Sequence, residues 1–192
     1  MKATDVLREE HEAVRVAMRI LGKICDRVES GKEFEIKHLE QLLDFIRVFT
    51  DKCHHGKEED VLFPAMEEIG IPREGGPVGV MLSEHETMRE YIRNFADALD
   101  EYASGDKSAT DAIVENVRTY LRWLDGHIEK ENNILFVMAD SHLSADKQEE
   151  LFEAFETLEE ERIGKDVHEQ FHQMLHELKA VYLEPRENSK TI

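Results

Sequence analysis

The chain has 192 residues, of which 41% are hydrophobic, so a single domain can bury a sizeable core. Its formal net charge of −19 argues against nucleic acid and against an anionic membrane surface as partners, because both are bound through clustered Lys and Arg. No signal-peptide pattern, bilayer-spanning apolar run or disulfide framework is visible. We therefore expect a cytoplasmic protein.

The apolar periodicity and the breaks between periodic segments predict five helical blocks. These blocks span about residues 4–28, 35–69, 78–102, 108–139 and 145–182. Pro64 is expected to kink the second block, and Gly164 to interrupt the fifth. Glycine and proline make the segment from 70 to 77 the clearest loop of the chain.

Long helices with short connections pack beside their sequence neighbours. The sequence therefore predicts an all-α protein, with an antiparallel up-and-down four-helix bundle over residues 1–143. An additional C-terminal helical segment is expected over 144–184 and a flexible tail over 185–192. The C-terminal segment is expected to pack on the bundle or to form a homodimer, and the sequence does not choose between these two.

One motif occurs twice. The segment from His54 reads HHGKEEDVLF, and about 73 residues later the segment from His127 reads HIEKENNILF. A second matched pair, E-H-E-x-x-R, lies upstream of each and is centred on His11 and His85. The duplication supplies four histidines and two glutamates from four predicted helices.

These histidines lie on the apolar sides of their helices. A single histidine there is more often a satisfied core residue, but burying four unpaired imidazoles and two carboxylates is costly, and a metal centre removes that cost. A His and a Glu four residues apart reach the same centre, and a carboxylate can bridge two ions. We expect a pair of iron ions rather than tetrahedral zinc. The predicted ligands are His11, His54, Glu58, His85, His127 and Glu131.

A competing pair with the same spacing, His55 and Glu59, lies one position further along the chain. The pair of His54 and Glu58 is preferred because its register matches the second copy of the motif. His55 is given no special role.

The two motifs, H-x-x-K-E-E-x-x-L-F-P from His54 and H-x-x-x-E-N-N-x-L-F from His127, resemble the hemerythrin-like family, or HHE cation-binding domain. The resemblance covers about residues 4–140. It implies a four-helix bundle that holds two non-haem iron ions with an oxo or hydroxo bridge, bound by the six residues named above.

The sequence departs from the oxygen-carrying members, which have a further histidine one turn after the ligand on the third helix. Arg89 stands at that place here. This implies a site with one imidazole fewer and a coordination position open to a small diatomic or peroxide ligand. The first hypothesis is that the protein binds or senses oxygen, nitric oxide or peroxide. The alternatives are iron storage or delivery, repair of iron centres, and a peroxidase-like di-iron oxidoreductase.

Other polar residues have both a functional and a structural interpretation. On the last helix, three histidines four residues apart suggest a second metal site, an additional ligand or a polar stripe: His168, His172 and His176. Tyr120 suggests a hydrogen-bond donor or electron relay near the metal, or a core tyrosine. The glutamates that flank the upstream histidines either orient imidazoles or face solvent: Glu10, Glu12, Glu84 and Glu86.

Overall fold

The computed structural model describes residues 1–184, with only the backbone of Lys165. Over this range the chain forms helices and no strand, which confirms the predicted all-α class. None of the described helices is long and apolar enough to cross a membrane. The predicted flexible tail, residues 185–192, lies outside the described residues.

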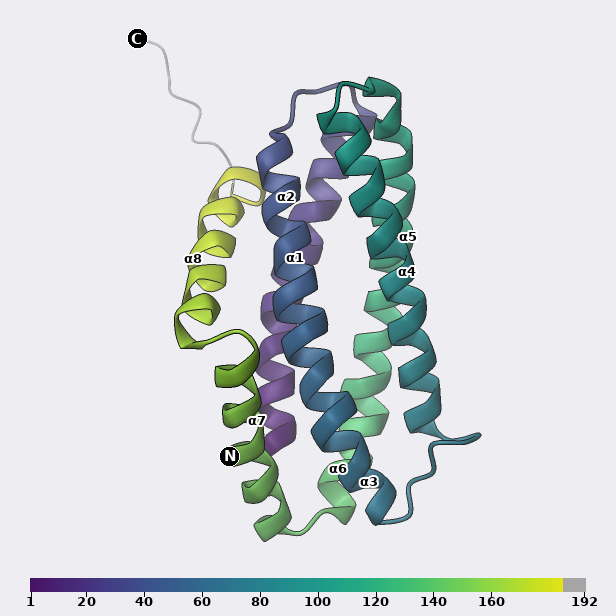
Figure 1. Ribbon diagram of the computed structural model, residues 1–192, viewed down its shortest axis with the longest axis vertical. Helices are drawn as coiled ribbons and strands as arrows, with labels where there is room; N and C mark the ends of the chain where they lie inside the picture. Colours follow the sequence, from purple (N-terminus) through teal and green to yellow (C-terminus); the bar gives the residue numbers. More distant parts are fainter. Residues whose placement is uncertain (185–192) are drawn as a thin grey trace.

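Four helical legs form the bundle and run alternately up and down (Figure 1). The first leg is α1 (Ala3–Glu29) and the third is α4 (Pro77–Ala103). The second leg consists of α2 (Ile36–Phe45), two π-helical segments, η1 (Ile46–His55) and η2 (Glu58–Leu62), and α3 (Phe63–Glu68). The fourth leg consists of η3 (Lys107–Ala109), α5 (Thr110–Lys130), the π-helical segment η4 (Glu131–Leu135) and α6 (Phe136–His142).

Two further helices, α7 (Ala145–Arg162) and α8 (Lys165–Tyr182), follow one another along one side of the bundle (Figure 1). The hydroxyl of Ser144 caps α7 by accepting a hydrogen bond from the backbone N–H of Lys147. Gly164, with φ of 78°, separates the two helices, since a positive φ suits glycine. The break falls where the sequence predicted it.

At Pro64 the sequence predicts a kink. The residue lies in the first turn of α3, directly after the π-helical segment η2. In a first turn the missing N–H of proline removes no α-helical hydrogen bond. The π-helical geometry on this leg, which the sequence reasoning did not anticipate, has a direct effect on the site described below.

Buried apolar side chains form two clusters, one at each end of the bundle. On α1 the smaller cluster ends with Leu7 and the larger one begins with Ala13. The same change of cluster occurs at about residues 50–61, 82–87 and 129–134 on the other three legs. All four legs thus cross one common layer between the clusters, and this layer contains buried polar residues.

The extension α7–α8 contributes to both clusters. Leu151 and Phe155 of α7 belong to the smaller cluster, and Phe171 and Leu175 of α8 belong to the larger one. Burial of these side chains against the bundle contributes to the same hydrophobic core, at roughly 25 cal/mol per Å² of apolar surface.

Truncating the buried anchor of α7 tests this packing. Phe155 is 1% exposed, so Phe155→Ala is expected to lower the free energy of unfolding by about 3–5 kcal/mol in urea denaturation. Phe152→Ala, on the half-buried side of the same helix, is the matched control and should cost much less. Equal losses for the two variants would contradict the packing of α7 on the core.

Candidate metal centre

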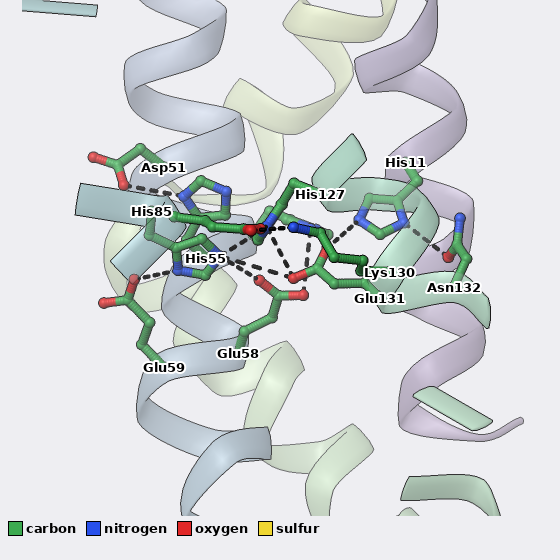
Figure 2. A network of polar contacts seen from close by, with 12 residues as sticks. His11, Asp51, His55, Glu58, Glu59, His85, His127, Lys130, Glu131 and Asn132 are labelled. Atoms are coloured by element: carbon green, nitrogen blue, oxygen red, sulfur yellow. Dashed lines mark hydrogen bonds and ion pairs between the residues drawn. The ribbon is translucent and has the colours of Figure 1, made fainter. Parts of the chain in front are cut away.

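Seven buried side chains from the four legs converge in the polar layer. Figure 2 shows the part of this network around Glu58 and Glu131. Six are the residues that the sequence predicted as ligands, and all six are brought together. The seventh is His55. The converging side chains are His11, His54, His55, Glu58, His85, His127 and Glu131.

Their donor atoms form two groups that share one carboxylate. In each group the ligand atoms lie within 4.8 Å of one another. One group contains His55, Glu58, His85 and His127, and the other contains His11, His54, Glu58 and Glu131. This is the arrangement needed to hold two neighbouring ions.

Both carboxylates direct one oxygen to each group. Glu131 Oε1 lies 2.9 Å from His127 Nε2, and its Oε2 lies 3.2 Å from His11 Nε2. Glu58 Oε1 lies 3.7 Å from His54 Nε2, and its Oε2 lies 3.5 Å from His85 Nε2. The two glutamates therefore occupy bridging positions between the groups.

In each of the five imidazoles, Nδ1 lies 2.6–3.2 Å from a side-chain oxygen on the side of the ring away from the centre. The oxygens belong to Asn132 for His11, Glu10 for His54, Asp51 for His55, Glu59 for His85 and Glu84 for His127. An Nδ1–H that donates to oxygen leaves Nε2 with a free lone pair, which is the form that binds a metal. These partners thus aim all five Nε2 atoms at the centre.

The contacts that remain are unfavourable without a cation. His85 Nε2 lies 3.0 Å from His127 Nε2, so two lone pairs face each other. A cation bound by both nitrogens would use these lone pairs and remove the repulsion. Both oxygens of Glu58 and of Glu131, and Nε2 of His11, lack hydrogen-bond partners. Burial, and then the negative charge of Glu131, raises the pKa of Glu58 well above its usual range. The residues present therefore fit metal ions.

The π-helical geometry of η1 explains why His54 and His55 both reach the centre. A hydrogen bond from i to i+5 adds a residue to each turn, so consecutive side chains are separated by a smaller angle than in an α-helix. The His55 ring stacks on His85 with 3.9 Å between ring centroids. At the equivalent position of the second copy stands Ile128, which packs in the larger apolar cluster. One group consequently has three imidazoles and the other has two.

The oxygen-carrying members have a further histidine at the position of Arg89. In this chain His55 brings a fifth imidazole to the centre instead. The inference that the site is one imidazole short is therefore revised, since sequence reasoning gave His55 no role. Arg89 acts from outside the centre, where it donates to Asp51 at 2.7 Å and to Glu59 at 2.8 Å. These two carboxylates hold His55 and His85. The signal that could have revealed His55 was its i,i+4 spacing to Glu59.

The remaining candidates lie around the centre. Glu10 and Glu84 are buried and hold imidazoles, whereas Glu12 and Glu86 are exposed. His168 lies with Glu10 and Glu159 in a separate cluster. Among residues 1–184, no cluster of metal-ligating side chains includes the other two histidines of the last helix, His172 and His176.

Tyr120 is buried, and its hydroxyl has no hydrogen-bond partner within the described part of the chain. Burial raises its pKa well above the usual range. It lines a cavity of about 140 Å³ together with Thr50 and His55. The tyrosine thus lines the same cavity as His55 of the three-imidazole group.

The family model "Hemerythrin HHE cation binding domain" matches residues 2–139. The chain therefore belongs to the hemerythrin HHE cation-binding family, and the seven converging side chains all lie within the matched residues. The helices α7 and α8 lie beyond the matched residues.

Several curated proteins are similar to the chain. An uncharacterized protein of Mycobacterium tuberculosis, Rv1995, is 23% identical over 85% of this chain and 63% of its own length. The iron-sulfur cluster repair protein YtfE of Edwardsiella ictaluri is 29% identical over 62% of this chain and 55% of its own length. The chain thus spans less than two thirds of these relatives. No solved structure matches it.

Removing the additional imidazole tests the three-imidazole group. His55→Ala is expected to lower the affinity for one of the two metal ions at least tenfold. Even the loss of a group that only supports a ligand typically lowers metal affinity by about 10–100-fold. Metal content after dialysis, measured by mass spectrometry, checks this. The control His142→Ala alters an exposed histidine and should keep the wild-type content. Full retention of two ions by His55→Ala would exclude it as a ligand.

Proposed function

We propose that this chain is a hemerythrin-like non-haem di-iron protein that binds or senses a small ligand, namely oxygen, nitric oxide or peroxide. The observation that carries the proposal is the pair of donor groups bridged by Glu58 and Glu131, with carboxylate oxygens that have no other partner. The proposed ligands are the six predicted residues and His55. Two bound iron ions would supply redox chemistry and a coordination position for the small ligand.

The donor set favours iron over zinc. Structural zinc is nearly always four-coordinate and closed, whereas each group here shares carboxylates with its neighbour. Imidazole with carboxylate oxygen is a set that iron accepts. A pair of carboxylates that each direct one oxygen to each group suits two ions in contact with common bridges. An oxo or hydroxo bridge between the ions belongs to this proposal.

We place the open coordination position on the two-imidazole group of His11 and His54, because it has one nitrogen donor fewer than the other group. Apolar rings pack against an imidazole of each group. Phe136 stacks on the ring of His11 at a centroid distance of 5.6 Å. Phe63 stacks on His85, which belongs to the three-imidazole group, at a centroid distance of 6.1 Å. A small uncharged or weakly polar molecule can enter such surroundings at lower cost than a hydrated ion.

A second candidate function is repair of damaged iron–sulfur centres. The similarity to proteins named iron-sulfur cluster repair protein YtfE favours it. This similarity covers only part of those relatives, so their activity is carried over here as a hypothesis. Repair by delivery of iron predicts that the bound ions are exchangeable.

Metal analysis with optical spectroscopy tests the first proposal. Protein purified without added metal is expected to contain two irons per chain and to show a charge-transfer absorption that bleaches on reduction. Mixing the reduced protein with oxygen or nitric oxide should produce new ligand-to-iron absorption within the mixing time of a stopped-flow experiment. One zinc per chain, or a reduced protein that is spectrally silent towards both gases, would overturn the proposal.

Iron transfer separates the two candidates. The iron-loaded protein is incubated with an apo iron–sulfur protein, and reconstitution of the cluster is followed by its visible absorption. Transfer faster than from an equal concentration of free iron supports repair or delivery. Retention of both irons, together with a rapid response to a gas, supports ligand binding.

A further inference from the structure

The duplicated motif builds the same support behind two of the imidazoles. His54 Nδ1 donates to Glu10 at 2.8 Å, and Lys57 donates to the other oxygen of that carboxylate. In the second copy His127 Nδ1 donates to Glu84 at 2.9 Å, and Lys130 donates to its other oxygen. A lysine three residues after each ligand thus fixes the carboxylate that orients the ligand.

The two supports differ in their surroundings. Lys57 is 1% exposed, whereas Lys130 is 39% exposed. The difference arises from α7, whose Glu159 accepts a second hydrogen bond from Lys57 at 2.6 Å. A lysine cannot be buried at low cost beside a single carboxylate that is already shared with a histidine, and Glu159 supplies the additional acceptor.

Neighbouring contacts hold α7 in this position. Arg162, one turn after Glu159, donates to the backbone oxygen of Lys52 at 3.1 Å and pairs with Asp60. Its guanidinium lies over Gly56, where a Cβ atom would clash with it. The absence of a side chain at Gly56 therefore leaves room for this guanidinium in its present position.

The charges in this chain of contacts are tightly matched. Burial alone would raise the pKa of Glu10, but the hydrogen bond from His54 and the charge of Lys57 outweigh burial and lower it to about 2. Removing the negative charge of Glu159 leaves Lys57 with one carboxylate. The lysine is then expected to bind Glu10 more tightly, which would weaken the hydrogen bond between Glu10 and His54.

We propose that the C-terminal extension is a working part of the metal centre, in which Glu159 acts through Lys57 and Glu10 as a positioning residue for His54. This inference rests on the proposed di-metal function. It makes the two donor groups unequal. The two-imidazole group is supported by α7, outside the four-helix bundle, and the three-imidazole group is supported by residues of the bundle itself. The family model matches residues 2–139, so α7 lies outside the matched residues.

Cobalt(II) titration of the full-length metal-free protein, followed by d–d absorption, tests the proposal. Glu159→Gln is expected to lower the affinity for one of the two cobalt ions by about 10–100-fold, as is typical when the partner of a ligand is lost. The absorption of that ion is expected to shift as well. Glu156→Gln removes the same charge from an exposed position of α7 and should match the wild type. Circular dichroism of the metal-free variants separates this effect from a loss of folding.

A double-mutant cycle tests the route through the lysine. In a Lys57→Met background, Glu159→Gln should have little additional effect, because the contact through which it acts is gone. In a Lys130→Met background its effect should be additive, since Lys130 supports the other half. Where Lys57→Met does not fold, the comparison of Glu159→Gln with Glu156→Gln and Lys130→Met decides.

The outcomes are distinguishable. A wild-type chain that fails to bind two cobalt ions contradicts the proposed function itself. A wild-type chain that binds two ions, with Glu159→Gln indistinguishable from Glu156→Gln in affinity and spectrum, leaves the function standing and overturns the role of Glu159.

Discussion

The structure depends on two carboxylates buried in the middle of a helical bundle. Glu58 and Glu131 are 0% exposed, and their oxygens find no hydrogen-bond donor in the described part of the chain. Burying an uncompensated carboxylate charge costs several kcal/mol, and burial with the charge of Glu131 raises the pKa of Glu58 well above its usual range. A cation between the two carboxylates would compensate this cost. Four of the five imidazoles bring Nε2 within 3.7 Å of these oxygens. The two apolar clusters above and below exclude water from the layer and make the compensation necessary.

Much of this centre could be predicted from the sequence because it is duplicated. A single His-x-x-x-Glu pair says little, whereas two copies in register identified His54, Glu58, His127 and Glu131 as residues that share one place. The helical blocks and the break at Gly164 followed from periodicity and from the conformational preference of glycine. These features are local, or repeated, and so are visible in the chain itself.

The rest could not be predicted, for physical reasons. His55 was given no role because the pair of His54 and Glu58 matches the second copy of the motif in register. The sequence does not reveal that η1 adopts π-helical hydrogen bonding. Glu10 and Glu12 look alike in the sequence, yet one is buried beside Lys57 and the other is exposed. Only the packing of helices decides this. Glu159 meets Lys57 across 102 residues of chain, a contact that no local pattern can reveal.

The two donor groups differ because a few residues differ between the two copies of the motif, while the repeated ligands stay the same. In one half His55 adds an imidazole, and Arg89 secures the carboxylates behind it. The other half keeps two imidazoles and has Glu159 behind it. An ion with fewer protein donors has more room for an external ligand, and it relies more on the orientation of those it has. The proposed support from the extension thus acts on the two-imidazole group, whose ion would depend most on the orientation of its ligands. Among the described residues, the three-imidazole group has no such contact with the extension.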